Sequence, residues 1–187
     1  MKLSKRGEYA LRSLINLGLA AEVGRPLVRV SELALHERLP AKFLEQIMQT
    51  LKDAGLVVSE RGKFGGYRLA KPAKTVAIGE VVRLIDGPLA PIGCVSQSAY
   101  EKCSCPDETH CGLRMLMLDV RNAIAGILDR YTLADVVEVT LRKMRRNHVP
   151  LPFAQNGSPR RATRKPARSA RARLQPIEGL IHQLLRA

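Results

Sequence analysis

Long hydrophobic runs are missing from this 187-residue sequence. A membrane-crossing helix needs about 18 or more apolar residues in succession, and no such stretch occurs. The first residues, MKLSKRGEYALRSLINLGLAAEVG, carry charges and lack the apolar core and small-residue cleavage site of a secretion signal. From these absences we expect a soluble, cytoplasmic protein that has no membrane partner.

Catalytic motifs are missing as well. The sequence contains no recognisable Ser, His and Asp set, no Gly-rich phosphate loop and no carboxylate pair, and its four histidines are scattered. We therefore do not expect an enzyme.

Cysteine is scarce and confined to one place. The four cysteines, Cys94, Cys103, Cys105 and Cys111, form the pattern C-x8-C-x-C-x5-C. Thiolates gathered on one loop are typical ligands of an iron-sulfur cluster or another metal. A closed zinc site is the alternative, although the CxxC pairs usual for zinc are absent. A disulfide framework is not expected in a reducing compartment.

Acidic residues are few, and the formal net charge is +14. This charge predicts a polyanionic partner, with nucleic acid the first candidate, because Lys and Arg placed against phosphates release counterions. After residue 141 the one acidic residue is Glu178. The stretch GSPRRATRKPARSARAR has too little apolar surface to offset its ordering entropy, so it predicts a disordered tail that either binds phosphates or is simply solvated. A short amphipathic helix is expected after it, carrying Ile177, Leu180, Ile181, Leu184 and Leu185.

The first part of the chain has the periodicity of a helix-turn-helix. One helix is predicted over residues 4–21, and a second from Ser31, a good N-cap, to about His36. A third is expected to open at Pro40 and to end at Gly55. Its apolar stripe is formed by Leu44, Ile47, Met48 and Leu51.

The opposite face of the third helix carries polar side chains. These residues, Lys42, Glu45, Gln46 and Gln49, are of types that reach base edges in a major groove. An ordinary solvated face is the competing interpretation. A hairpin then follows, with a strand at residues 56–59, the turn RGKFGG and a returning strand at residues 67–69. Arg61 and Lys63 at its tip suit phosphates or a minor groove, which predicts a DNA-binding wing in preference to a plain surface hairpin.

A later helix is too long to be covered by this small domain. It is predicted from Gly112 to about Tyr131, after a shorter helix that stops at Gly87. Dimerisation through it would suit a pseudo-palindromic operator, and an intramolecular core helix is the alternative. Thr132 is expected to cap a final helix. The near-heptad apolar stripe consists of Leu113, Leu116, Met117, Val120, Ile124, Ile127 and Leu128.

These elements predict a mainly α fold with a small β-wing: a winged helix-turn-helix domain and a long dimerisation helix. The expected divisions are 1–87 for the DNA-binding domain and 88–111 for a cysteine-rich, cluster-binding loop. They continue with 112–146 for the dimerisation region and 147–187 for a basic, largely disordered tail that ends in the short amphipathic helix.

Five segments in this order resemble the IscR/NsrR/RirA family of bacterial transcription regulators: MKLSKRGEYALRSLINL, LPAKFLEQIMQTLKDAGLV, RGKFGGYRLAKP, AIGEVVRLIDGP and the cysteine loop. The resemblance covers roughly residues 1–140. It implies a homodimeric winged-helix repressor or activator in which each subunit holds an iron-sulfur cluster that senses iron, nitric oxide or redox state. It also implies that Glu45 and Gln46 lie in the reading helix and that Arg61 enters the minor groove.

The resemblance also suggests the cluster ligands. The common family loop has three cysteines at about C-x5-C-x5-C, and this chain keeps the second interval between Cys105 and Cys111. Cys94, Cys105 and Cys111 are therefore the implied trio of a two-iron or four-iron cluster. Cys103 is a fourth ligand, an exchange partner or a bystander.

Residues outside the trio leave the fourth ligand open. Glu8 matches the position from which some relatives donate a ligand to the other subunit. Other relatives use a histidine where this chain has Arg114, which cannot be deprotonated to bind a metal. His110 is a further candidate, although an exposed loop histidine is its ordinary interpretation.

The expected function is a DNA-binding transcriptional regulator whose operator affinity is switched by the cluster. The alternative is a zinc-stabilised regulator, or one without a cluster that senses a metabolite or a thiol.

Overall fold

The computed structural model describes residues 2–62 and 64–154. In chain order the elements are α1 (Lys5–Glu22), α2 (Val30–Glu37), α3 (Ala41–Asp53), β1 (Val57–Glu60), β2 (Gly66–Leu69), η1 (Ala73–Thr75), α4 (Ile78–Asp86), η2 (Gly93–Val95), α5 (Gly112–Arg130) and α6 (Leu133–Arg146). The predicted fold, mainly α with a two-stranded wing, is confirmed. The predicted helix over residues 177–185 and the tail before it lie outside the described residues.

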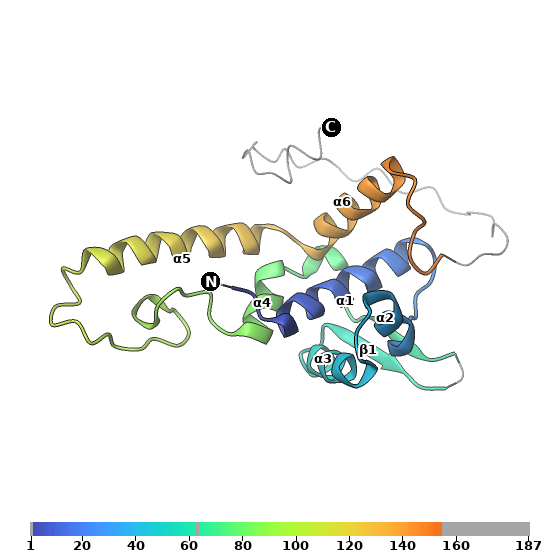
Figure 1. Cartoon of the computed structure of the whole chain (residues 1–187), viewed down its shortest axis with the longest axis horizontal. Coiled ribbons are helices and arrows are strands. Elements are labelled where there is room, and N and C mark those ends of the chain that lie inside the picture. Colours follow the sequence, from blue (N-terminus) through green and yellow to red (C-terminus); the bar gives the residue numbers. More distant parts are fainter. Residues whose placement is uncertain (1, 63, 155–187) are drawn as a thin grey trace.

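Helix α1 is the centre of a compact head formed with α2, α3 and the hairpin (Figure 1). The Ser4 hydroxyl accepts a hydrogen bond from the Gly7 backbone N–H at 2.9 Å and so caps the helix, close to the predicted start. Ala10 and Leu14 are fully buried against the apolar face of α3. Between α1 and α2, the buried Glu37 carboxylate accepts a hydrogen bond from Asn16 and pairs with Arg12.

The predicted cap of α2 is wrong. The helix begins at Val30 after the cap residue Arg29, and Ser31 is an exposed residue of its first turn. The reason is that Glu32 Oε2 accepts the Arg29 backbone N–H at 3.1 Å, which satisfies one free donor of the helix start from within the first turn. Arg38 then adopts a left-handed conformation, with φ of 56°, and ends the helix just before α3.

The hairpin and α3 agree closely with the sequence prediction. Pro40 is the N-cap residue directly before α3, and Gly55 follows the end of the helix with φ of 68°. Strands β1 and β2 are antiparallel, with Val57 opposite Leu69 and Glu60 opposite Gly66. Tyr67 also forms an isolated bridge with Val28, which ties the hairpin to the loop before α2.

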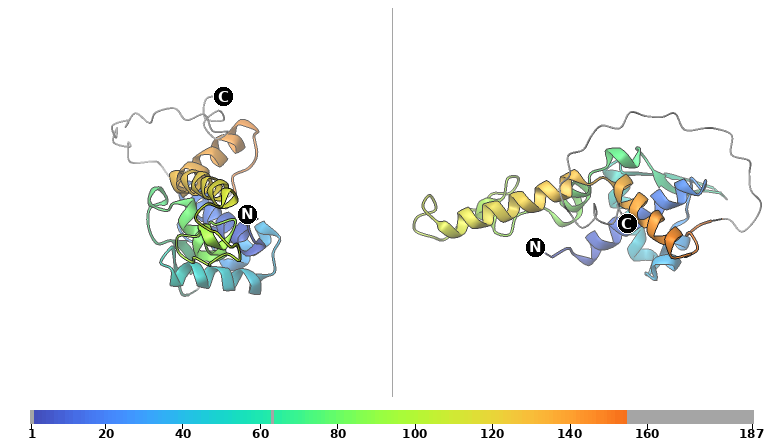
Figure 2. Two further views of the ribbon diagram at one scale, coloured as in Figure 1. Left: turned by 90° about the vertical axis from the view of Figure 1, so that its left-hand side faces the viewer. Right: turned by 90° about the horizontal axis from the view of Figure 1, so that it is seen from above.

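The segment between α4 and α5 runs outward from the head, and the long helix α5 lies beside it (Figure 2). Helix α5 brings the chain back to the head, where α6 follows. Thr132 caps α6 as predicted, its hydroxyl accepting from the Asp135 N–H at 3.3 Å. Helix α6 packs on α1 where Gly18 faces Val137.

The residues that follow α6 turn back onto the head. Leu151 and Phe153 pack against its core, and the Phe153 ring lies 5.3 Å from the His36 ring. None of the helices within residues 2–62 and 64–154 combines the length and apolar character needed to cross a membrane.

Candidate functional site

The outer face of α3 presents the four polar residues singled out by the sequence. Leu44, Ile47, Met48 and Leu51 are fully buried, so the helix cannot turn without exposing them. The opposite face is fixed as a result. Its members, all exposed, are Lys42, Glu45, Gln46 and Gln49. Their contact with DNA remains a prediction.

Two hydrogen bonds shape the end of this face. Gln49 Nε2 donates to Asp53 Oδ1 at 2.6 Å, which restrains its amide along the helix. Arg6, an exposed residue of α1, donates from its guanidinium to Thr50 Oγ1 at 2.8 Å. The latter contact brings a cation from the first helix to the edge of α3. Sequence reasoning missed Arg6, although the cationic run Lys2, Lys5 and Arg6 was a signal for it.

The wing tip has a backbone that requires glycine. Gly62 has φ of 110°, and a Cβ on Gly65 would lie 2.2 Å from the Glu60 carbonyl oxygen. Arg61 is exposed beside this turn, and its contact with DNA remains a prediction. Lys63, the second predicted cation, lies outside the described residues.

All four cysteines line one cavity of about 430 Å³ at the N-terminal end of α5. Cys94 is buried on η2, and Cys111 is the half-buried N-cap residue of α5. Cys103 and Cys105 come from the loop between them. The structure thus brings together residues that are separated by up to 17 positions in the chain.

Two of these cysteines form a disulfide, which the sequence analysis did not expect. Cys103 and Cys105, whose Cα atoms are 5.4 Å apart, are bonded to each other, and Cys94 and Cys111 are free thiols. The bend of the loop brings the two side chains to one side, and the Cys105 backbone N–H lies 3.3 Å from Cys103 Sγ. Within the described part of the chain, no group of three or more His, Cys, Asp or Glu side chains is arranged to hold a metal ion in this form.

The donor set nevertheless fits an iron-sulfur cluster once the disulfide is reduced. Such clusters are typically held by four cysteine thiolates, and reduction returns two sulfurs to a cavity that already contains Cys94 and Cys111. Arg114 also lines the cavity, and its guanidinium pairs with Glu108 at 3.1 Å. The Tyr100 hydroxyl donates to the same carboxylate at 2.7 Å, which raises the pKa of Tyr100.

A protein-family model described as an iron-dependent transcriptional regulator, Rrf2, matches residues 3–139. This chain belongs to the Rrf2 family. It is 39% identical over 137 residues to an rrf2-like HTH-type regulator of Rhodobacter capsulatus, covering 72% of this chain and 91% of that protein. It is 32% identical over 138 residues to IscR of Escherichia coli, covering 73% and 80% respectively.

Solved structures of Rrf2 proteins have the same winged-helix architecture. CymR of Bacillus subtilis, named the global cysteine regulator, matches with a TM-score of 0.60 and 30% identity over 74% of this chain and 97% of that one. IscR of T. potens matches with a TM-score of 0.55 and 27% identity, over 74% and 87%. The chain is therefore a DNA-binding transcriptional regulator and not an enzyme, and the resemblance drawn from the sequence is confirmed.

Glu8 does not line the cysteine cavity of its own chain in this Rrf2 protein. Its carboxylate lies 2.8 Å from Lys5 Nζ and 3.3 Å from the Arg12 guanidinium. The hydrogen bond from Lys5 and the charge of both cations lower its pKa, so it is ionised at neutral pH. A ligand role toward a second subunit remains a prediction.

His110 is exposed and lies beside the cavity without lining it. Its Nδ1 is 2.7 Å from Asp107 Oδ2, and this hydrogen bond lowers the pKa of Asp107. The Asp107 carboxylate also accepts from the Thr109 and His110 backbone N–H groups, so it orders the turn before Cys111.

Proposed function

We propose that this Rrf2 regulator is a cytoplasmic homodimer whose affinity for a pseudo-palindromic operator depends on an iron-sulfur cluster bound by the loop. Cys94, Cys105 and Cys111 are the proposed ligands, with Cys103 or the partner's Glu8 as the fourth. The observation that carries the proposal is the convergence of all four cysteines on one cavity at the start of α5.

The proposed dimer uses the exposed face of α5. Large apolar side chains seldom remain in water on one continuous helix face unless a partner covers them. The exposed members are Leu113, Leu116, Val120 and Ile127, with exposed fractions from 37% to 59%. A second copy is the simplest partner, because a twofold pair of heads matches a twofold operator.

The cysteine cavity lies at the start of α5, so a conformational change in the cysteine loop can move this helix. Cys111 is the N-cap residue of α5. Near the other end of that helix, Asp129 accepts two hydrogen bonds from the Arg83 guanidinium of α4, at 2.6 and 2.7 Å. A bound cluster would supply iron-thiolate bonds that respond to iron supply, oxidants and nitric oxide. In this proposal the cysteines anchor the loop to the start of α5, and the helix sets the spacing of the two heads.

Disulfide formation and cluster binding exclude each other in this loop. Joining Cys103 to Cys105 forms one S–S bond and releases two protons and two electrons, which an oxidant such as a peroxide takes up. The two sulfurs are then unavailable as thiolate ligands, and two free cysteines remain. The oxidised loop is therefore proposed to be a cluster-free form.

Iron and sulfide content tests the ligand assignment. Protein purified without oxygen should be coloured and hold iron and acid-labile sulfide. Cys94→Ala, Cys105→Ala and Cys111→Ala should each lose most of both. Cys103→Ala and Glu8→Ala distinguish the fourth ligand, and His110→Ala, beside the cavity, serves as the matched control and should keep its iron. A colourless wild-type protein that holds zinc would support the zinc alternative and refute the proposal.

A regulator that uses the thiols without a cluster is the second candidate. The Cys103–Cys105 disulfide favours it. In that case wild-type protein binds no metal after loading, reduced and oxidised forms differ in operator affinity, and Cys103→Ser abolishes the difference. If loaded protein holds iron and sulfide, this candidate fails.

A further inference from the structure

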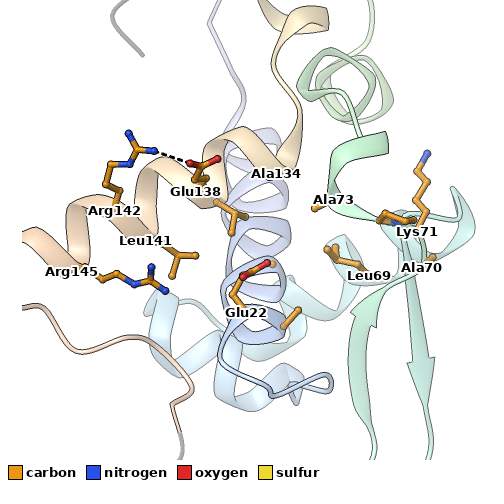
Figure 3. A pocket seen from close by; sticks show the side chains of 14 residues that line it. Glu22, Leu69, Ala70, Lys71, Ala73, Ala134, Glu138, Leu141, Arg142 and Arg145 are labelled. Carbon is orange, nitrogen blue, oxygen red and sulfur yellow. Dashed lines mark hydrogen bonds and ion pairs between the residues drawn. The ribbon is translucent and has the colours of Figure 1, made fainter. Parts of the chain in front are cut away.

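A second cavity lies in the head, between α1, the stretch from β2 to η1, and α6 (Figure 3). Its volume is about 900 Å³, within the range of roughly 300–1,000 Å³ typical of small-molecule sites. None of the cysteines lines it. It is therefore separate from the proposed cluster site.

Small residues create this space. Leu69, Val137 and Leu141 supply larger apolar side chains, and Val137 and Leu141 are buried. The rest of the apolar lining has no side chain longer than a methyl group, apart from the ring of Pro72. These small residues are Gly18, Ala21, Ala70, Ala73 and Ala134. The cavity thus offers an apolar surface that fits a side chain of a few carbon atoms.

The charged groups at the rim are not all paired. Lys71 Nζ lies 2.9 Å from Glu80 Oε1, and the Arg142 guanidinium lies 2.7 Å from Glu138 Oε1. Glu22 and Arg145 also line the cavity, and neither side chain makes an ion pair or hydrogen bond with another described residue. Figure 3 shows them on facing helices at one end of the cavity, Glu22 from α1 and Arg145 from α6.

We propose that this cavity binds a zwitterionic α-amino acid with an apolar side chain. The α-carboxylate accepts from the Arg145 guanidinium, whose paired N–H groups match a carboxylate. The ammonium group donates to the Glu22 carboxylate, and the side chain lies on Leu69 and Leu141. One free cation and one free anion beside an apolar surface are complementary to such a ligand, whereas a simple fatty acid would leave Glu22 without a partner.

A ligand in this position would contact both α1, the centre of the head, and α6, which directly follows α5. It would favour the arrangement in which α6 rests on α1, because binding stabilises the conformation that forms the site. Binding in this cavity would not depend on the cysteines, since none of them lines it. Its failure would leave the cluster proposal untouched.

Calorimetric titration of the full chain tests the proposal. The probes are L-leucine, L-methionine and L-valine, together with two analogues of leucine: 4-methylpentanoate, which lacks the ammonium group, and 3-methylbutylamine, which lacks the carboxylate. At least one amino acid should bind saturably, and where leucine binds, both of its analogues should bind at least about tenfold more weakly, a difference of about 1.4 kcal/mol.

Variants locate the site. Arg145→Gln and Glu22→Gln should each weaken binding about tenfold or more, and Ala134→Leu, which narrows the cavity, should weaken it as well. Lys143→Gln is the matched control, since Lys143 is exposed on α6 and does not line the cavity. The proposal is overturned if none of the three amino acids binds at ligand concentrations up to about 10 mM, which would detect even weak affinity. It is also overturned if the Arg145→Gln variant binds the amino acid as tightly as wild type does.

Discussion

At the scale of single residues, the exposed side chains of α3 differ in what they are placed to do. Lys42 carries a compact charge near the start of the helix, which suits a phosphate. Gln46 lies one turn further along and offers both a donor and an acceptor, which suits a base edge. The two residues should therefore affect DNA binding in different ways.

Replacing each of these residues by alanine separates affinity from specificity. Gln46→Ala should cost about 1–3 kcal/mol on the preferred operator and reduce discrimination at one base pair. Lys42→Ala should weaken binding to all sequences and lower the salt slope by about one. Fluorescence titrations at several salt concentrations, on operator duplexes and on single-base variants, measure both effects. Equal losses on all duplexes for both variants would contradict the assignment of Gln46.

At the scale of elements, the close contact between α1 and α6 depends on Gly18, which has no side chain. A Cβ on Gly18 would lie 2.5 Å from Val137 Cγ2, and Val137 is 4% exposed and branched at Cβ, so it cannot move aside easily. Gly18 is thus required by packing and not by backbone conformation.

Gly18→Ala should therefore destabilise the protein, although alanine favours a helix by about 1 kcal/mol over glycine. Overpacking costs about 1–3 kcal/mol, so we expect a net loss of about 1 kcal/mol in urea unfolding. Gly126→Ala on α5 is the matched control, because nothing lies within 4 Å of its added Cβ. That variant should gain up to about 1 kcal/mol. Equal responses at the two positions would refute this account of the α1–α6 contact.

The ion pair between Arg83 of α4 and Asp129 of α5 predicts a pH dependence. The hydrogen bonds from Arg83 lower the pKa of Asp129 below its ordinary value of 3.8. The stabilisation is present above that value and is lost as the pH falls through the lower folded pKa. Both side chains are about 40% exposed, at 39% and 45%, so the pair contributes only about 0.2–1 kcal/mol.

Asp129→Asn should consequently unfold at lower urea concentration than wild type at pH 7, and the difference should shrink as the pH approaches 3. Asp119→Asn, an exposed change elsewhere on α5, should show neither effect. A difference between wild type and Asp129→Asn that stays constant down to pH 3 would rule out the carboxylate as its source.

Local signals in the sequence predicted most of these elements. Pro40, Gly55 and Thr132 mark helix ends within a residue or two, because each acts on its own backbone. Ser31 misled the prediction because Glu32 stabilises the helix start one residue earlier, by accepting the Arg29 backbone N–H. Contacts such as Arg6 with Thr50, and the cavity between α1, β2 and α6, join distant segments. They require the folded chain, and no local pattern encodes them.

At the scale of the whole molecule, α5 determines how two copies would meet. Leu116 is 56% exposed within the apolar stripe of α5. Leu116→Glu should place a charge in the proposed interface and shift the protein from dimer to monomer, as measured by sedimentation equilibrium. Leu35→Glu is the control, because Leu35 is 82% exposed on α2 and away from that stripe. A wild-type monomer, or a Leu116→Glu dimer of undiminished affinity, would contradict a dimer formed through this face.

The most direct test of the central claim is the operator affinity of the same protein with and without its cluster. The operator is first selected from random duplexes by the protein itself, and titrations are carried out without oxygen. We expect the two dissociation constants to differ by about 5–150-fold, the usual range of coupling between sites. Equal dissociation constants, with iron and sulfide verified in one sample and absent from the other, would contradict the claim that the cysteine loop controls DNA binding.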